Sequence, residues 1–250
     1  MRTLTVNSLT RAAAVMTMAM AAAAAAVLSS ACSSAEGRPA DAHSPAAATA
    51  TATSTAAATA ITLAAQNDSA ISAQADQGRI DGSASAKVWV IEISDLQCPF
   101  CKRWHDTVYP KLRDEFIKTG KVRFAYVNFP LSQHKNAFAA ATAAMCASAQ
   151  GKFWGMHDGL FTAQEKWDEL SNPAPFFEST ASKLGVDMTA WKACLASPAI
   201  KKRIEGDMDR AKGAGVESTP SFIIAGRLIE GAMPWDDMKK AITTALSSGK

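Results

Sequence analysis

The chain has 250 residues, of which 48% are hydrophobic, so it holds enough apolar material for one buried core. Its formal net charge is +3, and without the first 32 residues, which carry two arginines and no acid, this charge falls to +1. Such a near-neutral balance gives no reason to expect nucleic acid binding.

Residues 1–32 have the pattern of an export signal. Arg2 and Arg11 provide the positive region, Ala12 to Leu28 provide the apolar region, and small residues follow. The apolar segment is short and rich in alanine for a membrane span, so a signal peptide is predicted. An ordinary N-terminal helix is the alternative.

The end of this segment resembles a bacterial lipoprotein signal. It reads Leu28-Ser-Ser-Ala-Cys32, with the large apolar residue one position further from the cysteine than the usual pattern has it. Cys32 is also the one of five cysteines that is left over when the others are grouped in pairs, and an unpaired thiol is unusual in an exported protein. We therefore predict that Cys32 is acylated, or is removed with the signal. Acylation would place the protein outside the cytoplasm, tethered to the membrane by a lipid anchor.

Residues 33–70 are predicted to be a disordered linker. Up to residue 65 the segment consists mainly of Ala, Thr, Ser and Pro and has few large apolar side chains. It cannot bury enough surface to offset the entropy lost on ordering.

The sequence changes from strand periodicity to helix periodicity around Cys98. Val88 to Ile93 form a nearly continuous apolar run, which is typical of a strand covered on both faces. After Pro99, which suits a first helical turn, apolar residues recur every three or four positions. These positions are Cys101, Trp104, Val108, Leu112 and Phe116. Cys98 is thus predicted to lie where a strand ends and a helix begins.

This placement predicts a redox site. The free backbone N–H groups and the positive end of the helix dipole favour a thiolate at Cys98. A stabilised thiolate favours the reduced pair, which makes the disulfide more oxidising. Cys101 lies one turn further on, on the buried stripe. We predict that Cys98 attacks and that Cys101 resolves the mixed disulfide.

One C-x-x-C motif is also half of a zinc site. Here, however, the remaining cysteines stand singly and His105 offers only one further candidate ligand. The strand-to-helix context matches a thioredoxin-like redox motif instead, so no metal or other cofactor is expected.

The rest of the chain predicts an α/β domain. Lys121–Phe129 reads as the next strand, Ser221–Glu230 as a hairpin and Pro234–Ser247 as a closing helix. Between strand and hairpin the pattern is helical, in five segments. These are Asn136–Gln150, Lys152–Phe161, Pro175–Leu184, Met188–Leu195 and Ala199–Ala214.

Three motifs occur in a specific order: Ser94-Asp-Leu-Gln-Cys-Pro-Phe-Cys101, Gln150-Gly-Lys-Phe-Trp-Gly-Met-His-Asp-Gly-Leu-Phe161 and Gly215-Val-Glu-Ser-Thr-Pro-Ser-Phe222. With them the chain resembles the DsbA-like branch of the thioredoxin superfamily, in particular its thioredoxin_4 group, over about residues 78–248. The resemblance implies a thioredoxin fold over 71–250, with a helical insertion at about 132–215. It also implies thiol–disulfide exchange on exported proteins.

The resemblance assigns roles to further residues. Glu92 matches the buried acid that passes protons to and from Cys101; its alternative is a solvated carboxylate at a strand end. Thr219-Pro220 matches the cis-proline that faces the C-x-x-C motif and orients an extended substrate peptide.

Other assignments stay open. Some members of the resembled group join Cys146 and Cys194 as a structural disulfide, and two buried free thiols are the alternative. Pro99 and Phe100 are expected to contact substrate beside Thr219-Pro220, with Phe100 exposed. The best-known oxidases carry His where Phe100 stands, which leaves the direction of exchange open.

Trp104 and Phe153 fit either an apolar rim for substrates or the core. Asp95 is expected to be a turn or cap residue. The histidines at 105, 134 and 157 have no metal-ligand spacing and are expected at the surface or in the core.

We predict an extracytoplasmic thiol–disulfide oxidoreductase that introduces or exchanges disulfide bonds in exported, unfolded or partly folded proteins with free cysteines. Its reoxidation implies a membrane partner of the DsbB or VKOR-like type. The alternatives are a disulfide reductase or isomerase, and a non-catalytic lipoprotein that binds a partner through the thioredoxin fold.

Overall fold

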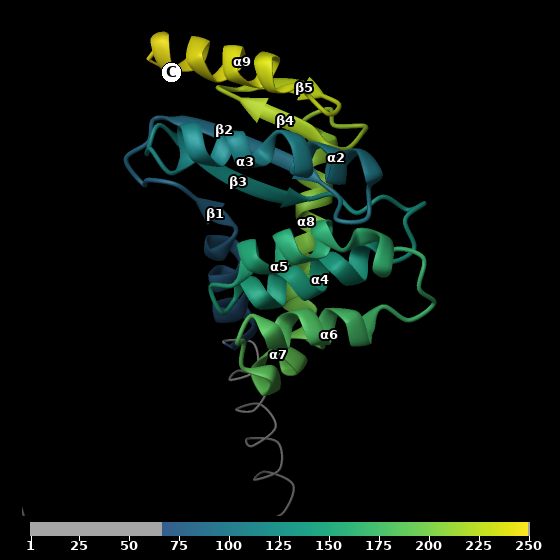
Figure 1. Ribbon diagram of the computed structural model, residues 1–250. Helices are drawn as coiled ribbons and strands as arrows, with labels where there is room; N and C mark the ends of the chain where they lie inside the picture. Colours follow the sequence, from purple (N-terminus) through teal and green to yellow (C-terminus); the bar gives the residue numbers. More distant parts are fainter. Residues whose placement is uncertain (1–66, 250) are drawn as a thin grey trace, which may run out of the picture. The chain divides into compact units, whose positions relative to one another are not determined.

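A five-stranded mixed sheet lies at the centre of the computed structural model, which describes residues 67–249 (Figure 1). Across the sheet the strands follow the order β1-β3-β2-β4-β5. The strands are β1 (Ile80–Asp81), β2 (Val88–Ser94), β3 (Val122–Asn128), β4 (Ser221–Ile224) and β5 (Arg227–Glu230). The central strand β2 runs parallel to β3 and antiparallel to β4. The predicted signal peptide, Cys32 and nearly all of the predicted linker lie outside the described residues.

Helices connect and cover the strands. Residues 67–78 are helical and span the predicted boundary between linker and domain at residue 71. The crossover from β2 to β3 consists of α2 (Pro99–Thr107), α3 (Tyr109–Leu112) and the π-helical turn η1 (Arg113–Ile117). Between β3 and β4 come α4 (Ala137–Ser148), α5 (Phe153–Thr162), the short η2 (Gln164–Lys166), α6 (Ala174–Lys183), α7 (Met188–Leu195) and α8 (Pro198–Gly213), and α9 (Trp235–Ser247) follows β5.

The two faces of the sheet carry different helices because alternate side chains point to opposite sides. Val90, Phe124 and Ile224 form one buried face, against which α2, α3, η1 and α9 pack. The opposite face carries Ile93 and is covered by α8 through Ala211. A sheet enclosed on both faces explains why the β2 sequence reads as a nearly continuous apolar run.

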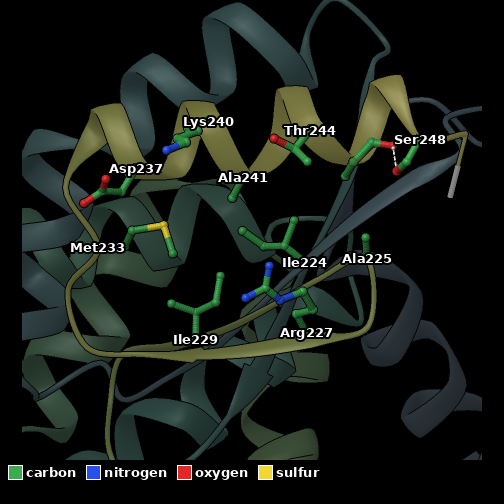
Figure 2. A pocket seen from close by; sticks show the side chains of 11 residues that line it. Ile224, Ala225, Arg227, Ile229, Met233, Asp237, Lys240, Ala241, Thr244 and Ser248 are labelled. Atoms are coloured by element: carbon green, nitrogen blue, oxygen red, sulfur yellow. Dashed lines mark hydrogen bonds between the residues drawn. The ribbon is translucent and has the colours of Figure 1, made fainter.

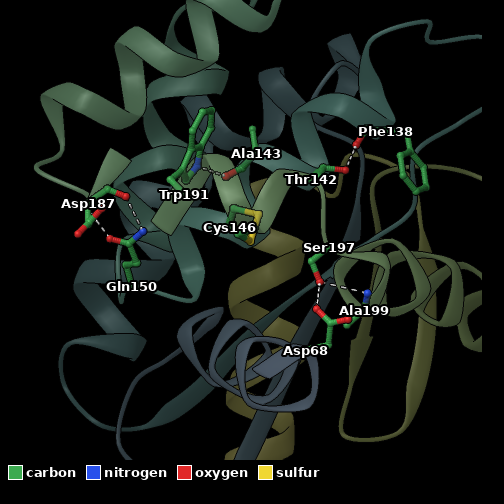
Figure 3. Close-up of a disulfide and its surroundings, with 11 residues drawn as sticks. Asp68, Phe138, Thr142, Ala143, Cys146, Gln150, Asp187, Trp191, Ser197 and Ala199 are labelled. Atoms are coloured by element: carbon green, nitrogen blue, oxygen red, sulfur yellow. Dashed lines mark hydrogen bonds between the residues drawn. A yellow bond between two sulfur atoms is a disulfide. The ribbon is translucent and has the colours of Figure 1, made fainter. Parts of the chain in front are cut away.

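The helices α4 to α7 gather together in Figure 1 as a helical subdomain inserted between β3 and β4. Helix α4 is mostly alanine and almost wholly buried, so the neighbouring helices can approach its backbone closely. A disulfide joins Cys146 of α4 to Cys194 of α7, with a Cα–Cα distance of 5.7 Å (Figure 3). Beside it, the indole of Trp191 donates a hydrogen bond to the Ala143 carbonyl.

The α/β prediction of a thioredoxin fold with an inserted helical subdomain is thus confirmed. The predicted strands and helices agree with the structure to within one or two residues at most ends. No helix among residues 67–249 combines the length and apolar character that a membrane span requires.

Candidate active site

Cys98 lies at the junction of strand and helix. It is the N-cap residue of α2, and Pro99 follows in the first turn. Both thiols of the motif are free and buried, with 3% of Cys98 and none of Cys101 exposed. Phe100 between them is 53% exposed, as expected from the sequence. The arrangement therefore presents an apolar ring to solvent directly beside the first sulfur.

The surroundings of Cys98 favour its thiolate. A hydrogen bond from the Cys101 thiol, together with others that include the backbone amides of Phe100 and Cys101, lowers the pKa of Cys98 to about 6. Burial and the nearby Cys98 sulfur raise the pKa of Cys101 well above its ordinary value. The two cysteines thus differ as their predicted roles require: the attacking Cys98 is anionic, and the resolving Cys101 is protonated.

This polarisation predicts the pH dependence of Cys98. The thiolate is the reactive form, so alkylation of the reduced protein should rise with pH, reach half its maximum near pH 6 and level off above about pH 7. Thiolate absorbance at 240 nm should follow the same curve, and the Cys98→Ser variant should lose it. A midpoint near that of an ordinary cysteine, about 8.5, would show that the helix start does not stabilise the thiolate.

The Thr219-Pro220 segment faces this motif. The peptide bond between the two residues is cis, and the Cys98 sulfur lies 3.5 Å from the Thr219 carbonyl oxygen. Thr219 directly precedes β4, which pairs with β2. Two segments separated by about 120 residues of sequence thus meet at one sulfur atom.

Glu92 lies on the same face of β2 as Ser94 and is fully buried, which excludes the solvated alternative. Neither of its carboxylate oxygens has a hydrogen-bond partner among residues 67–249. Burial raises the pKa of Glu92 to about 7. A carboxyl group with this pKa can both give and take a proton under ordinary conditions.

Asp95 is a turn residue, as expected, but it also joins its own loop to the loop that follows β3. Its carboxylate accepts hydrogen bonds from the Gln97 amide at 2.8 Å, the Leu131 amide at 2.9 Å and His134 Nδ1 at 2.6 Å. Gln164, which the sequence did not single out, donates to the carbonyls of Leu96 and Cys98. The loop that carries Cys98 is therefore held from the helical subdomain as well as from the sheet.

The structure brings together two histidines that have no metal-ligand spacing in the sequence. His105, on α2, and His157, on α5, both contact Oδ1 of Asp158, at 3.2 and 2.8 Å. Among the described residues this is the one group of His, Cys and acidic ligand atoms close enough together to hold a metal ion. His134 lies apart from it, beside Asp95. The two histidines are 157 − 105 = 52 positions apart in the sequence, and for this reason no spacing motif revealed the pair.

Trp104 and Phe153 are both buried, so neither lines a rim and both belong to the core. A hollow of about 510 Å³ opens between the β4–β5 hairpin and α9 (Figure 2). Its lining includes Arg227, Met233 and Lys240, but none of the candidate site residues. The candidate active site is therefore the surface around Cys98 and Thr219.

Comparison with known proteins adds to this geometry. Residues 74–244 match the family model of Thioredoxin_4, described as thioredoxin. The chain belongs to the Thioredoxin_4 family. It is a DsbA-like member of the thioredoxin superfamily and a thiol–disulfide oxidoreductase.

One curated relative in this group is the "probable disulfide bond formation protein D" of Bacillus anthracis. It is 34% identical over 181 residues, which cover 71% of this chain and 80% of the relative. Oxidised BdbD of Bacillus subtilis, a solved structure, is 25% identical with a TM-score of 0.62, over 68% of this chain and 94% of BdbD.

The alpha-DsbA1 structure of Wolbachia pipientis also has a TM-score of 0.62, at 22% identity, over 68% of this chain and 92% of that one. At this identity the likeness supports the fold alone. This chain therefore shares its fold with BdbD and alpha-DsbA1, and about a third of its aligned residues with a protein named for disulfide bond formation.

Proposed function

We propose that this protein introduces disulfide bonds into exported proteins, using Cys98 and Cys101 as its redox pair. The observation that carries the proposal is the stabilised thiolate of Cys98 at the start of α2, 3.5 Å from the Thr219 carbonyl. A thiolate stabilised in the reduced form makes the corresponding disulfide a stronger oxidant. The name of the Bacillus anthracis relative agrees with this direction of exchange.

The reaction transfers two electrons from substrate to enzyme. A substrate thiolate attacks the Cys98 sulfur of the Cys98–Cys101 disulfide, which forms a mixed disulfide and releases Cys101 as a thiolate. A second substrate thiolate attacks the substrate sulfur of that mixed disulfide and releases Cys98. The substrate leaves with a disulfide, and the enzyme holds two thiols. In the reverse direction, Cys101 attacks Cys98 to free a reduced substrate.

Glu92 is proposed to handle the proton of Cys101. When Cys101 is released as a thiolate, the protonated carboxyl of Glu92 can give it a proton, and the carboxylate takes one back when the disulfide re-forms. The pKa of about 7 for Glu92 suits both directions. Burial of both groups makes an uncompensated charge costly, so this transfer should accompany the exchange.

Substrate is proposed to lie along Thr219-Pro220, with Pro99 and Phe100 beside it. Backbone pairing at Thr219 accepts an extended peptide with little regard to its sequence. The exposed ring of Phe100 can make apolar contacts with the side chains that an unfolded substrate exposes.

Buried Cys146 and Cys194 form a disulfide in another part of the fold, which supports a structural role for that pair.

The location and the partners follow from the same proposal. An intact structural disulfide suits an oxidising compartment outside the cytoplasm. We propose a lipid anchor at Cys32, exported proteins with free cysteines as substrates, and a membrane reoxidase of the DsbB or VKOR-like type.

The direction of exchange can be tested by equilibrating the pair with glutathione. The expected potential is above about −200 mV, nearer to strong oxidants than to thioredoxin. The oxidised protein should also oxidise a peptide that carries two cysteines, and the Cys98→Ser variant should not. A potential near −270 mV, with rapid insulin reduction, would assign the protein to the reductases instead.

A disulfide that resists reduction by glutathione would support the non-catalytic binder. The free thiols and the lowered pKa of Cys98 favour the oxidoreductase over that alternative.

A further inference from the structure

His105 is held between two carboxylates inside the domain. Its Nδ1 lies 3.1 Å from Oδ1 of Asp106, and its Nε2 lies 3.2 Å from Oδ1 of Asp158. Ionised carboxylates can only accept hydrogen bonds, so this arrangement requires a proton on both ring nitrogens. Burial lowers the pKa of His105, but the hydrogen bonds to Asp158 and Asp106 outweigh it and raise the pKa. The side chain is therefore an imidazolium, only 8% exposed.

His157 shares the same carboxylate but carries no charge. Burial lowers its pKa to about 4, and its Nδ1 lies 2.8 Å from Oδ1 of Asp158. Although burial acts in the opposite sense, hydrogen bonds from His105 and His157 hold the pKa of Asp158 well below its usual range. Asp158 therefore stays ionised, and one of the two histidines is a cation.

This cation lies over the part of the sheet that carries Glu92. On that face the cross-strand neighbours of Glu92 are Tyr126 and Phe222. The ring of His157 contacts Tyr126 at 5.4 Å between centroids, and Trp104 contacts Phe222 at 4.7 Å.

His105 follows Trp104 in the chain, and its ring lies 5.2 Å from that of His157. Trp104 and His157 therefore pack on the two cross-strand neighbours of Glu92, and His105 lies next to both of them. Glu92 has no hydrogen-bond partner of its own among the described residues.

We propose that His105 is a positioning residue for the proton of Glu92. Its imidazolium, clamped by Asp106 and Asp158, stabilises the carboxylate form of a group that would otherwise stay protonated. The inference rests on the proposed function, in which Glu92 exchanges a proton with Cys101.

The effect of His105 on the pKa of Glu92, and that of Glu92 on the pKa of His105, both agree with this proposal. Burial raises the pKa of Glu92, and the Ser94 hydroxyl and the charge of His105 both oppose that effect; in turn, the charge of Glu92 is among those that raise the pKa of His105. Without the cation, Ser94 would be left to stabilise the anion, so the carboxyl would give up its proton at a higher pH. Other charged or titratable groups around the cluster are Cys101, Lys102, Tyr109, Arg113 and Tyr126.

The test is a titration of Glu92 in the reduced full-length protein. The infrared carbonyl band of its protonated carboxyl is identified as the band that the Glu92→Gln variant loses. In His105→Gln, which keeps a polar side chain but no charge, the midpoint of this band should rise by about one pH unit. His105→Asn should shift it in the same direction, and it serves if His105→Gln does not fold.

Lys102→Gln is the matched control, because it removes one positive charge from the same helix. Lys102 pairs with Asp106 at the partly exposed edge, so the midpoint should move by no more than about a third as much. In a protein that already carries Glu92→Gln there is no carboxyl left to titrate. Adding His105→Gln to this variant should therefore leave the pH profile of its peptide oxidation unchanged.

An unmoved Glu92 midpoint in both His105→Gln and His105→Asn would overturn the inference, and so would an equal shift in Lys102→Gln. The titration needs no substrate. A protein that shows the shift but oxidises no peptide would therefore overturn the proposed function and leave the electrostatic pairing standing.

Discussion

Replacing Cys101 with alanine is expected to abolish turnover in peptide oxidation and to trap substrates on the enzyme. Without Cys101 the enzyme cannot hold its own disulfide and so cannot oxidise a peptide with two thiols. The Cys98 thiolate at the start of α2 still attacks a substrate disulfide and forms a mixed disulfide. No enzyme thiol is then available to free the substrate from Cys98, because Cys146 and Cys194 are bonded to each other. Adducts that disappear on reduction should be visible on a non-reducing gel, and mass spectrometry should place them at Cys98.

Two controls accompany this variant. Cys98→Ala should form no adducts, because the fully buried Cys101 cannot be reached by a protein substrate. A double replacement of Cys146 and Cys194 by alanine should keep turnover at a temperature where it remains folded. Undiminished turnover in Cys101→Ala would rule out Cys101 as the resolving residue.

Asp207→Ala is expected to destabilise the protein by about 3 kcal/mol, because it leaves the buried guanidinium of Arg79 with only the partly exposed Asp76 as its ion-pair partner. Asp207, on α8, is fully buried and accepts hydrogen bonds from the guanidinium of Arg79. It also accepts from the backbone and side-chain amides of Asn128, at the end of β3. Urea denaturation followed by tryptophan fluorescence should show the loss as a lower midpoint with an unchanged slope.

The matched control is Asp114→Ala, which removes an aspartate from an ion pair with Lys118. Both side chains of that pair are mostly exposed, so the expected loss is below about 0.5 kcal/mol. Equal effects of the two substitutions would show that Asp207 does not hold α8 to the sheet.

Much of the candidate site could be predicted because its signals are local. The change of period at Cys98 marks a strand followed by a helix, and the thiolate chemistry depends largely on the first turn of that helix. Alternation along β2 likewise places Glu92 on the face of Ser94. That this face is closed by α2, and hence that the Glu92 carboxyl is dry, depends on packing.

The histidines show where such prediction stops. His105 and His157 look unrelated in the sequence, because metal-ligand spacing and helix periodicity cover only a few residues. Their shared contact with Asp158 exists because α5, from the inserted subdomain, packs against α2. The same holds for Arg79 and Asp207, which are 128 residues apart.

The sequence by itself determined the redox motif, the order of strands and helices, and membership of a DsbA-like group, since these depend on composition, periodicity and short motifs. Only the tertiary structure decided which polar and charged groups interact: Glu92 with the charge of His105, Asp95 with His134, and Asp207 with both Arg79 and Asn128. The physical reason is that Coulomb interactions and burial act through space, so they depend on how distant segments pack and not on their order along the chain.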